Sequence, residues 1–77
     1  MNIEQRVIAT AVELMDIELV SITSSMNLKS DLGMDSLDRL ELIMAVEDEF
    51  DIEFDDETAD SFETIGDIVN NVTKVVE

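Results

Sequence analysis

The chain has 77 residues and a formal net charge of −16 at pH 7, and it contains no cysteine, histidine or proline. This length allows one domain with a small core, and a disulfide framework or a Cys/His zinc site is excluded because the residues that build them are absent. The charge disfavours binding to nucleic acid or to an anionic membrane, since phosphate groups would be repelled, and no apolar run approaches the roughly 18 residues of a membrane span. The first residues, MNIEQRVIAT, lack the pattern of a secretory signal, so we expect a cytoplasmic protein.

Residues 2–15 form the first predicted element, a helix with Asn2 as its N-cap. Its apolar residues recur at helical spacing and comprise Ile3, Val7, Ile8, Ala11, Leu14 and Met15. Residues 16–35 follow as a long connection rich in Ser, Thr and Asn, and a connection of this length in a small domain usually has a function or contains an irregular turn. The apolar residues scattered along it indicate that it packs on the helices; they are Ile17, Val20, Ile22, Met26, Leu28 and Leu32.

Three further helices are predicted after this connection. One spans residues 36–50, a short one spans 56–62 with Phe62 directed inward, and the last runs from Thr64, its N-cap, to about residue 76. The apolar face of the last helix comprises Ile65, Ile68, Val69, Val72, Val75 and Val76. Because strong helix formers dominate and Gly is confined to two positions, the sequence favours an all-α helical bundle over residues 1–77.

The helix predicted over 36–50 has apolar residues on two sides. A helical wheel places a core face on one side, made of Leu42, Ile43, Val46 and Phe50. A second apolar strip lies on the other side, where Leu37, Leu40 and Met44 are framed by Glu41, Glu47 and Asp48. An apolar centre with a charged rim is typical of a protein interface, but the same residues could pack under the long connection or the third helix. The pattern leaves both interpretations open.

The acidic residues are unevenly distributed. Fifteen of the 20 lie between residues 31 and 67, where Arg39 is the one basic residue. A solvated acidic surface is one interpretation of this segment, and a surface that attracts basic protein partners is another. Calcium binding through an EF-hand loop is excluded because no window fits its pattern, whereas the clusters at 47–51 and 55–57 leave loose binding of divalent cations open.

The start of the second helix presents a serine. If Asp35 is the N-cap, the anionic Asp38 occupies the third helical position, which suits the positive end of the helix dipole. If Ser36 were the N-cap, the cationic Arg39 would stand there instead, so the first register is preferred. The Ser36 hydroxyl is then free of a capping role and open to solvent, and Gly33 upstream lets the backbone turn tightly. An anion attached to this hydroxyl would lie beside free backbone N–H groups.

Ser36 is not expected to act as a catalytic nucleophile. A serine nucleophile needs a base, and the chain has no histidine and no G-x-S-x-G motif. Lys29 is the only amine nearby, and nothing in the sequence around it suggests burial. A serine presented in this way is interpreted as the substrate of another enzyme, with an ordinary solvent-facing serine at a helix start as the alternative.

The segment DLGMDSL at residues 31–37 and the acidic helix DRLELIMAVEDEF at 38–50 resemble the acyl carrier proteins, and the resemblance extends over essentially the whole chain. It implies a four-helix bundle with a short third helix and a long first loop. It also implies that Ser36 receives 4′-phosphopantetheine from coenzyme A, through a phosphopantetheinyl transferase that uses Mg²⁺ near Asp35. The thiol of this arm would carry acyl groups as thioesters for fatty-acid or related lipid or polyketide biosynthesis, so the protein would be a monomeric carrier and not an enzyme.

The resemblance also gives the second apolar strip a role. In the family, the helix after the serine docks on basic patches of the enzymes that load and process the acyl group. The positions that match this docking surface are Leu37, Leu40, Glu41, Met44, Glu47 and Asp48. No specific metal site is implied, because Mg²⁺ is needed only during modification.

Three features depart from the family pattern. Arg39 introduces a cation toward the core side, where it is expected to pair with an acid of the long loop or of the third helix, or to alter partner docking. The stretch EFDDE at 53–57 lacks the proline common in carriers of fatty-acid synthesis, and Phe54 and Phe62 add apolar content near the third helix. Two alternatives therefore stay open: a specialised carrier for an amino-acyl or other dedicated pathway and, in a different class, an acidic cation-binding interaction protein.

Overall fold

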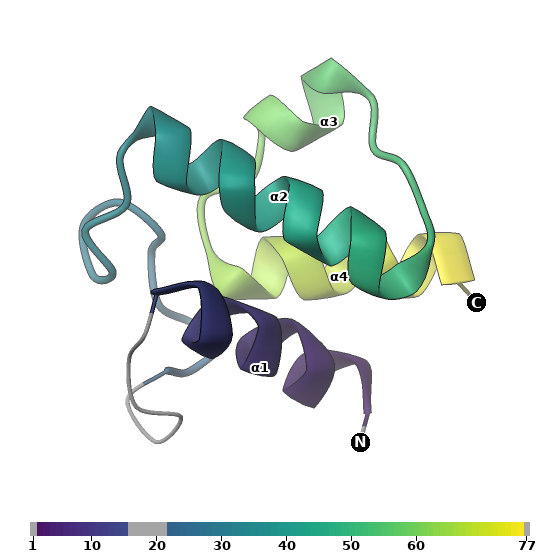
Figure 1. Cartoon of the computed structure of the whole chain (residues 1–77), viewed down its shortest axis with the longest axis horizontal. Helices are drawn as coiled ribbons and strands as arrows, with labels where there is room; N and C mark the ends of the chain where they lie inside the picture. Colours follow the sequence, from purple (N-terminus) through teal and green to yellow (C-terminus); the bar gives the residue numbers. More distant parts are fainter. Residues whose placement is uncertain (1, 16–21, 77) are drawn as a thin grey trace.

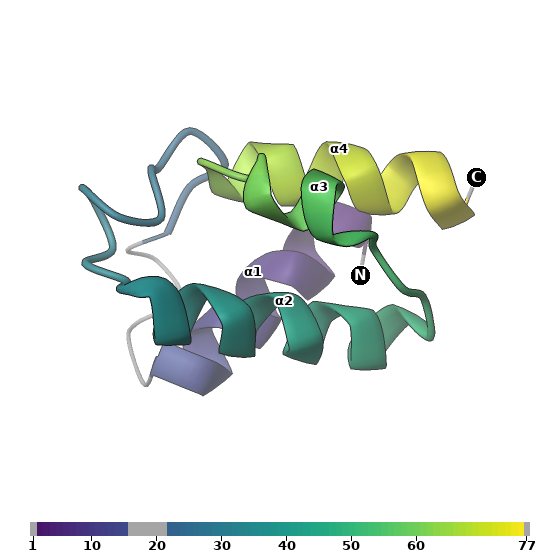
Figure 2. The same cartoon turned by 90° about the horizontal axis from the view of Figure 1, so that it is seen from above.

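The computed structural model describes residues 2–15 and 22–76, which contain four α-helices (Figure 1). They are α1 (Ile3–Met15), α2 (Ser36–Phe50), α3 (Asp56–Asp60) and α4 (Ile65–Val76). α1 packs against both α2 and α4, and the short α3 lies on the opposite side of the bundle from α1 (Figure 1 and Figure 2). The predicted four-helix bundle with a short third helix and a long first loop is confirmed. Within the described ranges, no helix combines the length and apolarity of a membrane span.

α1 and α4 begin at the caps that the sequence predicts. At α1, Gln5 N donates to Asn2 Oδ1 at 2.8 Å, and Asn2 N donates to Gln5 Oε1 at 3.1 Å. At α4, Asp67 N donates to Thr64 Oγ1 at 3.1 Å, and Thr64 N donates to Asp67 Oδ2 at 3.0 Å. These reciprocal bonds satisfy N–H groups that a helix start leaves unpaired, so both predicted N-caps are confirmed.

The described part of the long loop, residues 22–35, is built onto the start of α4. Ile65 N donates to the Met26 carbonyl at 3.1 Å, and Gly66 N donates to the Ser24 carbonyl at 2.8 Å. Loop carbonyls thereby bind two donors of the first turn of α4 that have no partner within the helix. A side chain at Gly66 would disturb this contact, since a Cβ there would stand 3.1 Å from the Ser24 carbonyl oxygen.

Apolar residues of this loop pack on the helices, as predicted. Ile22 and Leu28 are buried, Leu32 packs against the core, and Met26 is half-buried. Ile17 and Val20, for which the same contact is predicted, lie outside the described residues.

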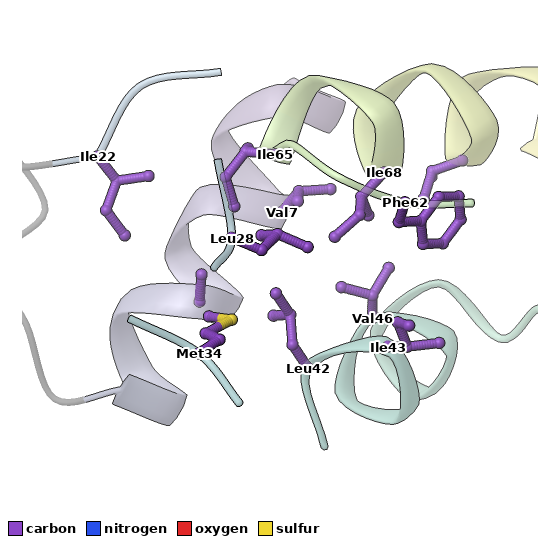
Figure 3. Packing of buried hydrophobic residues seen from close by; sticks show 12 residues of the cluster. Val7, Ile22, Leu28, Met34, Leu42, Ile43, Val46, Phe62, Ile65 and Ile68 are labelled. Carbon is purple, nitrogen blue, oxygen red and sulfur yellow. The ribbon is translucent and has the colours of Figure 1, made fainter. Parts of the chain in front are cut away.

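The core lies between α1, α2 and α4 (Figure 3). Its buried side chains are Val7, Ala11, Ile22, Leu28, Met34, Leu42, Ile43, Val46, Phe62, Ile65, Ile68 and Val72. α2 contributes three of the four residues of its predicted core face, and the fourth, Phe50, is partly buried at the helix end. Leu14, Val75 and Val76 are exposed, in contrast to their predicted place on apolar faces, because they lie in the last turns of α1 and α4, where less of the bundle covers them.

The third helix is shorter than its predicted span of 56–62. It ends at Asp60, and the N and Oγ atoms of Ser61 donate to the Thr58 carbonyl at 3.1 and 2.6 Å. These bonds close the last turn, after which the chain leaves the helix and Phe62 enters the core. The predicted inward direction of Phe62 is confirmed, and the predicted end of the helix is wrong.

Candidate functional site

Asp35 caps α2 and leaves Ser36 free. Asp38 N donates to Asp35 Oδ1 at 2.9 Å, and Asp35 N donates to Asp38 Oδ2 at 3.3 Å, which makes a reciprocal capping box. Ser36 is the first residue of α2 and is exposed, and among the residues that the structure describes none bonds to its hydroxyl. The predicted register of the helix start is confirmed.

The turn before Ser36 is held by backbone bonds. Gly33 N donates to the Lys29 carbonyl at 3.0 Å, and Met34 N donates to the Leu28 carbonyl at 2.9 Å. Gly33 has a φ of +69°, a left-handed conformation that favours glycine, so the predicted tight turn is confirmed. Met34 is buried in the core, which anchors the chain two residues before the serine.

The second apolar strip of α2 faces solvent. Leu37, Leu40 and Met44 have exposed fractions of 62%, 52% and 58%. With more than half of each side chain open to solvent, they do not pack under the long loop or α3, and that interpretation of the strip is wrong. Glu41 and Asp48 are exposed on the same helix.

Glu47 differs from the other acids of the strip. It is partly buried, and Glu47 Oε2 accepts a hydrogen bond from Phe54 N at 2.7 Å. The Glu47 carbonyl also accepts from Ile52 N at 3.0 Å and from Asp51 N. Glu47 thus ties the α2–α3 connection to α2, a role that sequence analysis missed because its partners are backbone N–H groups.

Arg39 binds the end of α3. Its Nη2 donates to the carbonyl oxygens of Phe62, Ala59 and Asp60 at 2.7, 2.9 and 3.4 Å. The predicted pairing with an acid is wrong, since no ion pair of Arg39 occurs among the described residues. The physical reason is that carbonyl groups at a helix end have no partner within the helix and attract a cation.

A pocket of about 370 Å³ opens beside Arg39. It is lined by Asn27, Leu28, Lys29, Arg39, Asp60, Phe62 and Glu63. Arg39 follows Ser36 by three residues in α2, and residues at this spacing lie on the same side of a helix, so the pocket and the serine share that side. The sequence does not reveal this pocket, because three segments that are far apart in the chain build it.

The acidic residues form no metal centre in the described part of the chain. No group of three or more His, Cys, Asp or Glu side chains there is placed to hold a metal ion. The loose divalent sites that the sequence left open at 47–51 and 55–57 therefore gain no support. Ser36 instead fits the covalent attachment of a flexible arm, because its hydroxyl is exposed and Gly33 brings no side chain to the preceding turn.

Comparison with known proteins identifies relatives over nearly the whole chain. Residues 5–72 match the family model described as a phosphopantetheine attachment site. The chain is 41% identical over 73 residues to acyl carrier proteins from two strains of Caulobacter vibrioides, with 95% of this chain and 94% of each relative covered. A solved structure from Mycobacterium tuberculosis, assigned as an acyl carrier protein, matches with a TM-score of 0.90 at 34% identity and covers 96% of this chain and 99% of that one.

These matches agree with the helical bundle and with the resemblance seen in the sequence. They also confirm the prosthetic group and the non-catalytic role that the resemblance implies. The chain therefore belongs to the acyl carrier protein family, whose members carry covalently attached 4′-phosphopantetheine, are modified by a phosphopantetheinyl transferase and catalyse no reaction themselves.

Proposed function

We propose that Ser36 is the residue to which 4′-phosphopantetheine is attached. Its place at the start of α2 supports this assignment: the hydroxyl is exposed, and Asp35 takes the capping role. A phosphate bonded to this oxygen would stand at the positive end of the α2 dipole, where negative charge is stabilised. Because no described residue bonds to the hydroxyl, we assign removal of its proton to the transferase.

Asp35 is proposed to lie next to the Mg²⁺ that the transferase uses during this step. Its Oδ1 accepts the capping bond from Asp38 N, and the side chain is exposed. This arrangement leaves Oδ2 to face the metal. The metal belongs to the modification reaction and does not stay with the carrier.

The arm supplies a thiol, which this chain lacks, since it has no cysteine. On that thiol the carrier is proposed to hold acyl groups as thioesters for fatty-acid or related lipid or polyketide biosynthesis, as a cytoplasmic monomer with residues 1–77 acting as one domain. The 41% identity to acyl carrier proteins supports this setting. A carrier dedicated to an amino-acyl or other special pathway is the second candidate, favoured by Arg39 and by the absence of proline at 53–57.

The docking surface is proposed to consist of Leu37, Leu40, Glu41, Met44, Glu47 and Asp48. Its exposed apolar strip gives a partner apolar area to bury, which is the term that drives most association. The acids beside the strip attract basic patches on the transferase and on the enzymes that load and process the acyl group. Glu47 acts there through its charge, because one of its oxygens is already bonded to Phe54 N.

Loading with a phosphopantetheinyl transferase tests the attachment residue. The purified chain is incubated with coenzyme A, Mg²⁺ and a transferase of broad specificity, and its intact mass is measured. One added arm is expected on the wild type and on the control Ser30→Ala, which changes another exposed serine. No addition is expected on Ser36→Ala. An unmodified wild type, or a modified Ser36→Ala variant, would contradict the proposal.

Identification of the cargo separates the two candidate settings. The carrier is isolated from its native source, and the groups bound to the arm are identified by mass spectrometry. Acyl chains of graded length would support the fatty-acid or related lipid setting, and an amino acid would support the dedicated pathway.

A further inference from the structure

α3 is the helix least secured by burial. It has five residues, none of which is buried. The rings of Phe54 and Phe62, on either side of it in the chain, lie edge to face with centroids 5.1 Å apart. In the described part of the chain, the hydrogen bonds that join the end of α3 to α2 come from Arg39.

Arg39 meets backbone carbonyl groups at the end of α3 and directly after it. Its Nη2 carries two hydrogens, so the contacts to the Phe62 and Ala59 oxygens at 2.7 and 2.9 Å are the strong ones, and the third, to Asp60 at 3.4 Å, is weak. α3 has no basic residue in its last turn, so Arg39 supplies from another helix the positive charge that a helix end favours. The charge on the donor also strengthens these bonds.

This contact borders the pocket beside Arg39. Leu28 and Phe62 line that pocket and are also core residues, with exposed fractions of 1% and 2%. Arg39 and Asp60 line it where α2 meets the end of α3. The side chains shared by the pocket and the core thus come from the long loop and from the segment directly after α3.

We propose that Arg39 is a clamp that fastens the end of α3 to α2 and holds the pocket closed toward the core. Loss of the guanidinium leaves the Ala59 and Phe62 carbonyls without their charged donor. α3 then opens locally, while α1 and α4, which have buried residues of their own, stay folded. The clamp belongs to the unmodified fold, so it does not depend on which residue receives the arm.

Arg6 provides a matched control at the end of another helix. Its Nε donates to Glu49 Oε2 at 3.0 Å, and its Nη2 donates to the Glu49 carbonyl at 3.2 Å. The guanidinium carbon lies 4.2 Å from the centre of the Phe50 ring. Arg6→Met and Arg39→Met therefore remove the same group from two comparable contacts, one at the end of α2 and one at the end of α3.

Amide hydrogen exchange, measured by NMR on the unmodified chain, tests the clamp. The amides of Ala59, Ser61 and Phe62 report on α3, because they donate to the carbonyls of Asp55, Thr58 and Ala59. The amides of Ile65 and Gly66, which donate to the long loop, report on α4 in the same sample.

Arg39→Met is expected to speed exchange at the α3 amides at least about tenfold and to change the α4 amides by less than about twofold. Arg39→Lys, which keeps a charged donor, is expected to give intermediate rates at α3. Arg6→Met is expected to leave the α3 amides at wild-type rates. The neutral dye Nile red is expected to fluoresce more strongly with Arg39→Met than with the wild type, because this variant opens the pocket to the dye. With Arg6→Met its fluorescence is expected to stay at the wild-type level.

Unchanged α3 exchange in Arg39→Met would overturn the proposal. So would wild-type α3 amides that already exchange at the rate of an unfolded chain, since nothing would then be fastened. Equal acceleration in α3 and α4 would overturn it as well, because it would show a loss of global stability. Equal dye fluorescence in the wild type and Arg39→Met would overturn the assignment of the pocket to the clamp.

Discussion

An N-cap oxygen is engaged in a hydrogen bond to the helix backbone, so one hydroxyl cannot both cap α2 and stand free for modification. In this chain Asp35 takes the cap, and Ser36 at the next position keeps an unbonded, exposed hydroxyl among the described residues. The structural task and the proposed chemical task therefore belong to two neighbouring residues, and each can be removed without the other.

Asp35→Ala is expected to lower the free energy of unfolding by about 1 kcal/mol, because it removes the cap of α2. Ser36→Ala is expected to change it by less than about 0.5 kcal/mol, because the lost hydroxyl has no bond to replace. Urea unfolding of the unmodified variants, followed by circular dichroism, measures both values. Equal losses for the two variants would show that the tasks are not divided in this way.

Asp55, the N-cap of α3, is expected to give the fold a specific pH dependence. The pKa of Asp55 is held below its ordinary value of 3.8 by two hydrogen bonds from Thr58. The bond from the Thr58 side chain has the larger effect, and the bond from the Thr58 backbone has the smaller one. A carboxylate whose pKa is lowered by folding contributes stability above its unfolded-state pKa and loses it as the pH falls through the folded-state pKa. Asn can also cap a helix but does not titrate, so it isolates this effect.

Melting temperatures of the wild type and Asp55→Asn, measured from about pH 6 to about pH 2, are expected to converge at the acid end of this range. The wild type is expected to be the more stable of the two above pH 3.8. Both chains share the loss of general charge repulsion on acidification, so the difference between them reports on Asp55. A difference that stays constant with pH would contradict the assignment.

At the scale of helices, periodic features are predictable from sequence, and contacts to distant backbone groups are not. The core face and the exposed strip of α2 follow from spacing within one helix, and the cap beside Ser36 involves residues at most three apart. The partners of Arg39 are backbone carbonyls 20 or more residues away, which no side-chain pattern encodes. The end of α3 is hidden for a related reason, since five residues are too few to show a period.

The two faces of α2 are expected to respond differently to substitution. Met44→Ala and Glu41→Lys are each expected to slow loading by a partner enzyme roughly five- to tenfold with unchanged melting temperature, because both residues are exposed on the proposed docking surface. Val46→Ala, on the buried face, is expected to lower the free energy of unfolding by about 1–2 kcal/mol. Mass spectrometry of loading reactions stopped at successive times measures the loading rate, and thermal unfolding measures the change in stability. Loading of both surface variants at the wild-type rate would assign the strip another purpose.

At the scale of the whole molecule, charge repulsion opposes the compact fold. The net charge is −16, and Arg6 and Arg39 are each bonded within the bundle to the end of a helix. The described acids form no group of three that would hold a metal ion, so cations are expected to act through general screening. The surface that could attract a basic partner is thus also a source of charge repulsion that opposes folding.

Millimolar Mg²⁺ or Ca²⁺ is expected to raise the melting temperature by about 5 °C, with similar curves for the two ions, because screening relieves the repulsion. Thermal unfolding at increasing cation concentration measures the effect, with NaCl at matched ionic strength as the control. No shift with any of the three salts would contradict this explanation, and saturation by one ion alone would indicate a specific site.

The attachment residue can be located directly after loading with coenzyme A and a transferase. Trypsin cleaves after Lys29 and Arg39, so the peptide of residues 30–39 contains both Ser30 and Ser36. Fragmentation of this peptide in a mass spectrometer is expected to place the arm on Ser36. An arm on Ser30 or on any other peptide would contradict the account of this helix start.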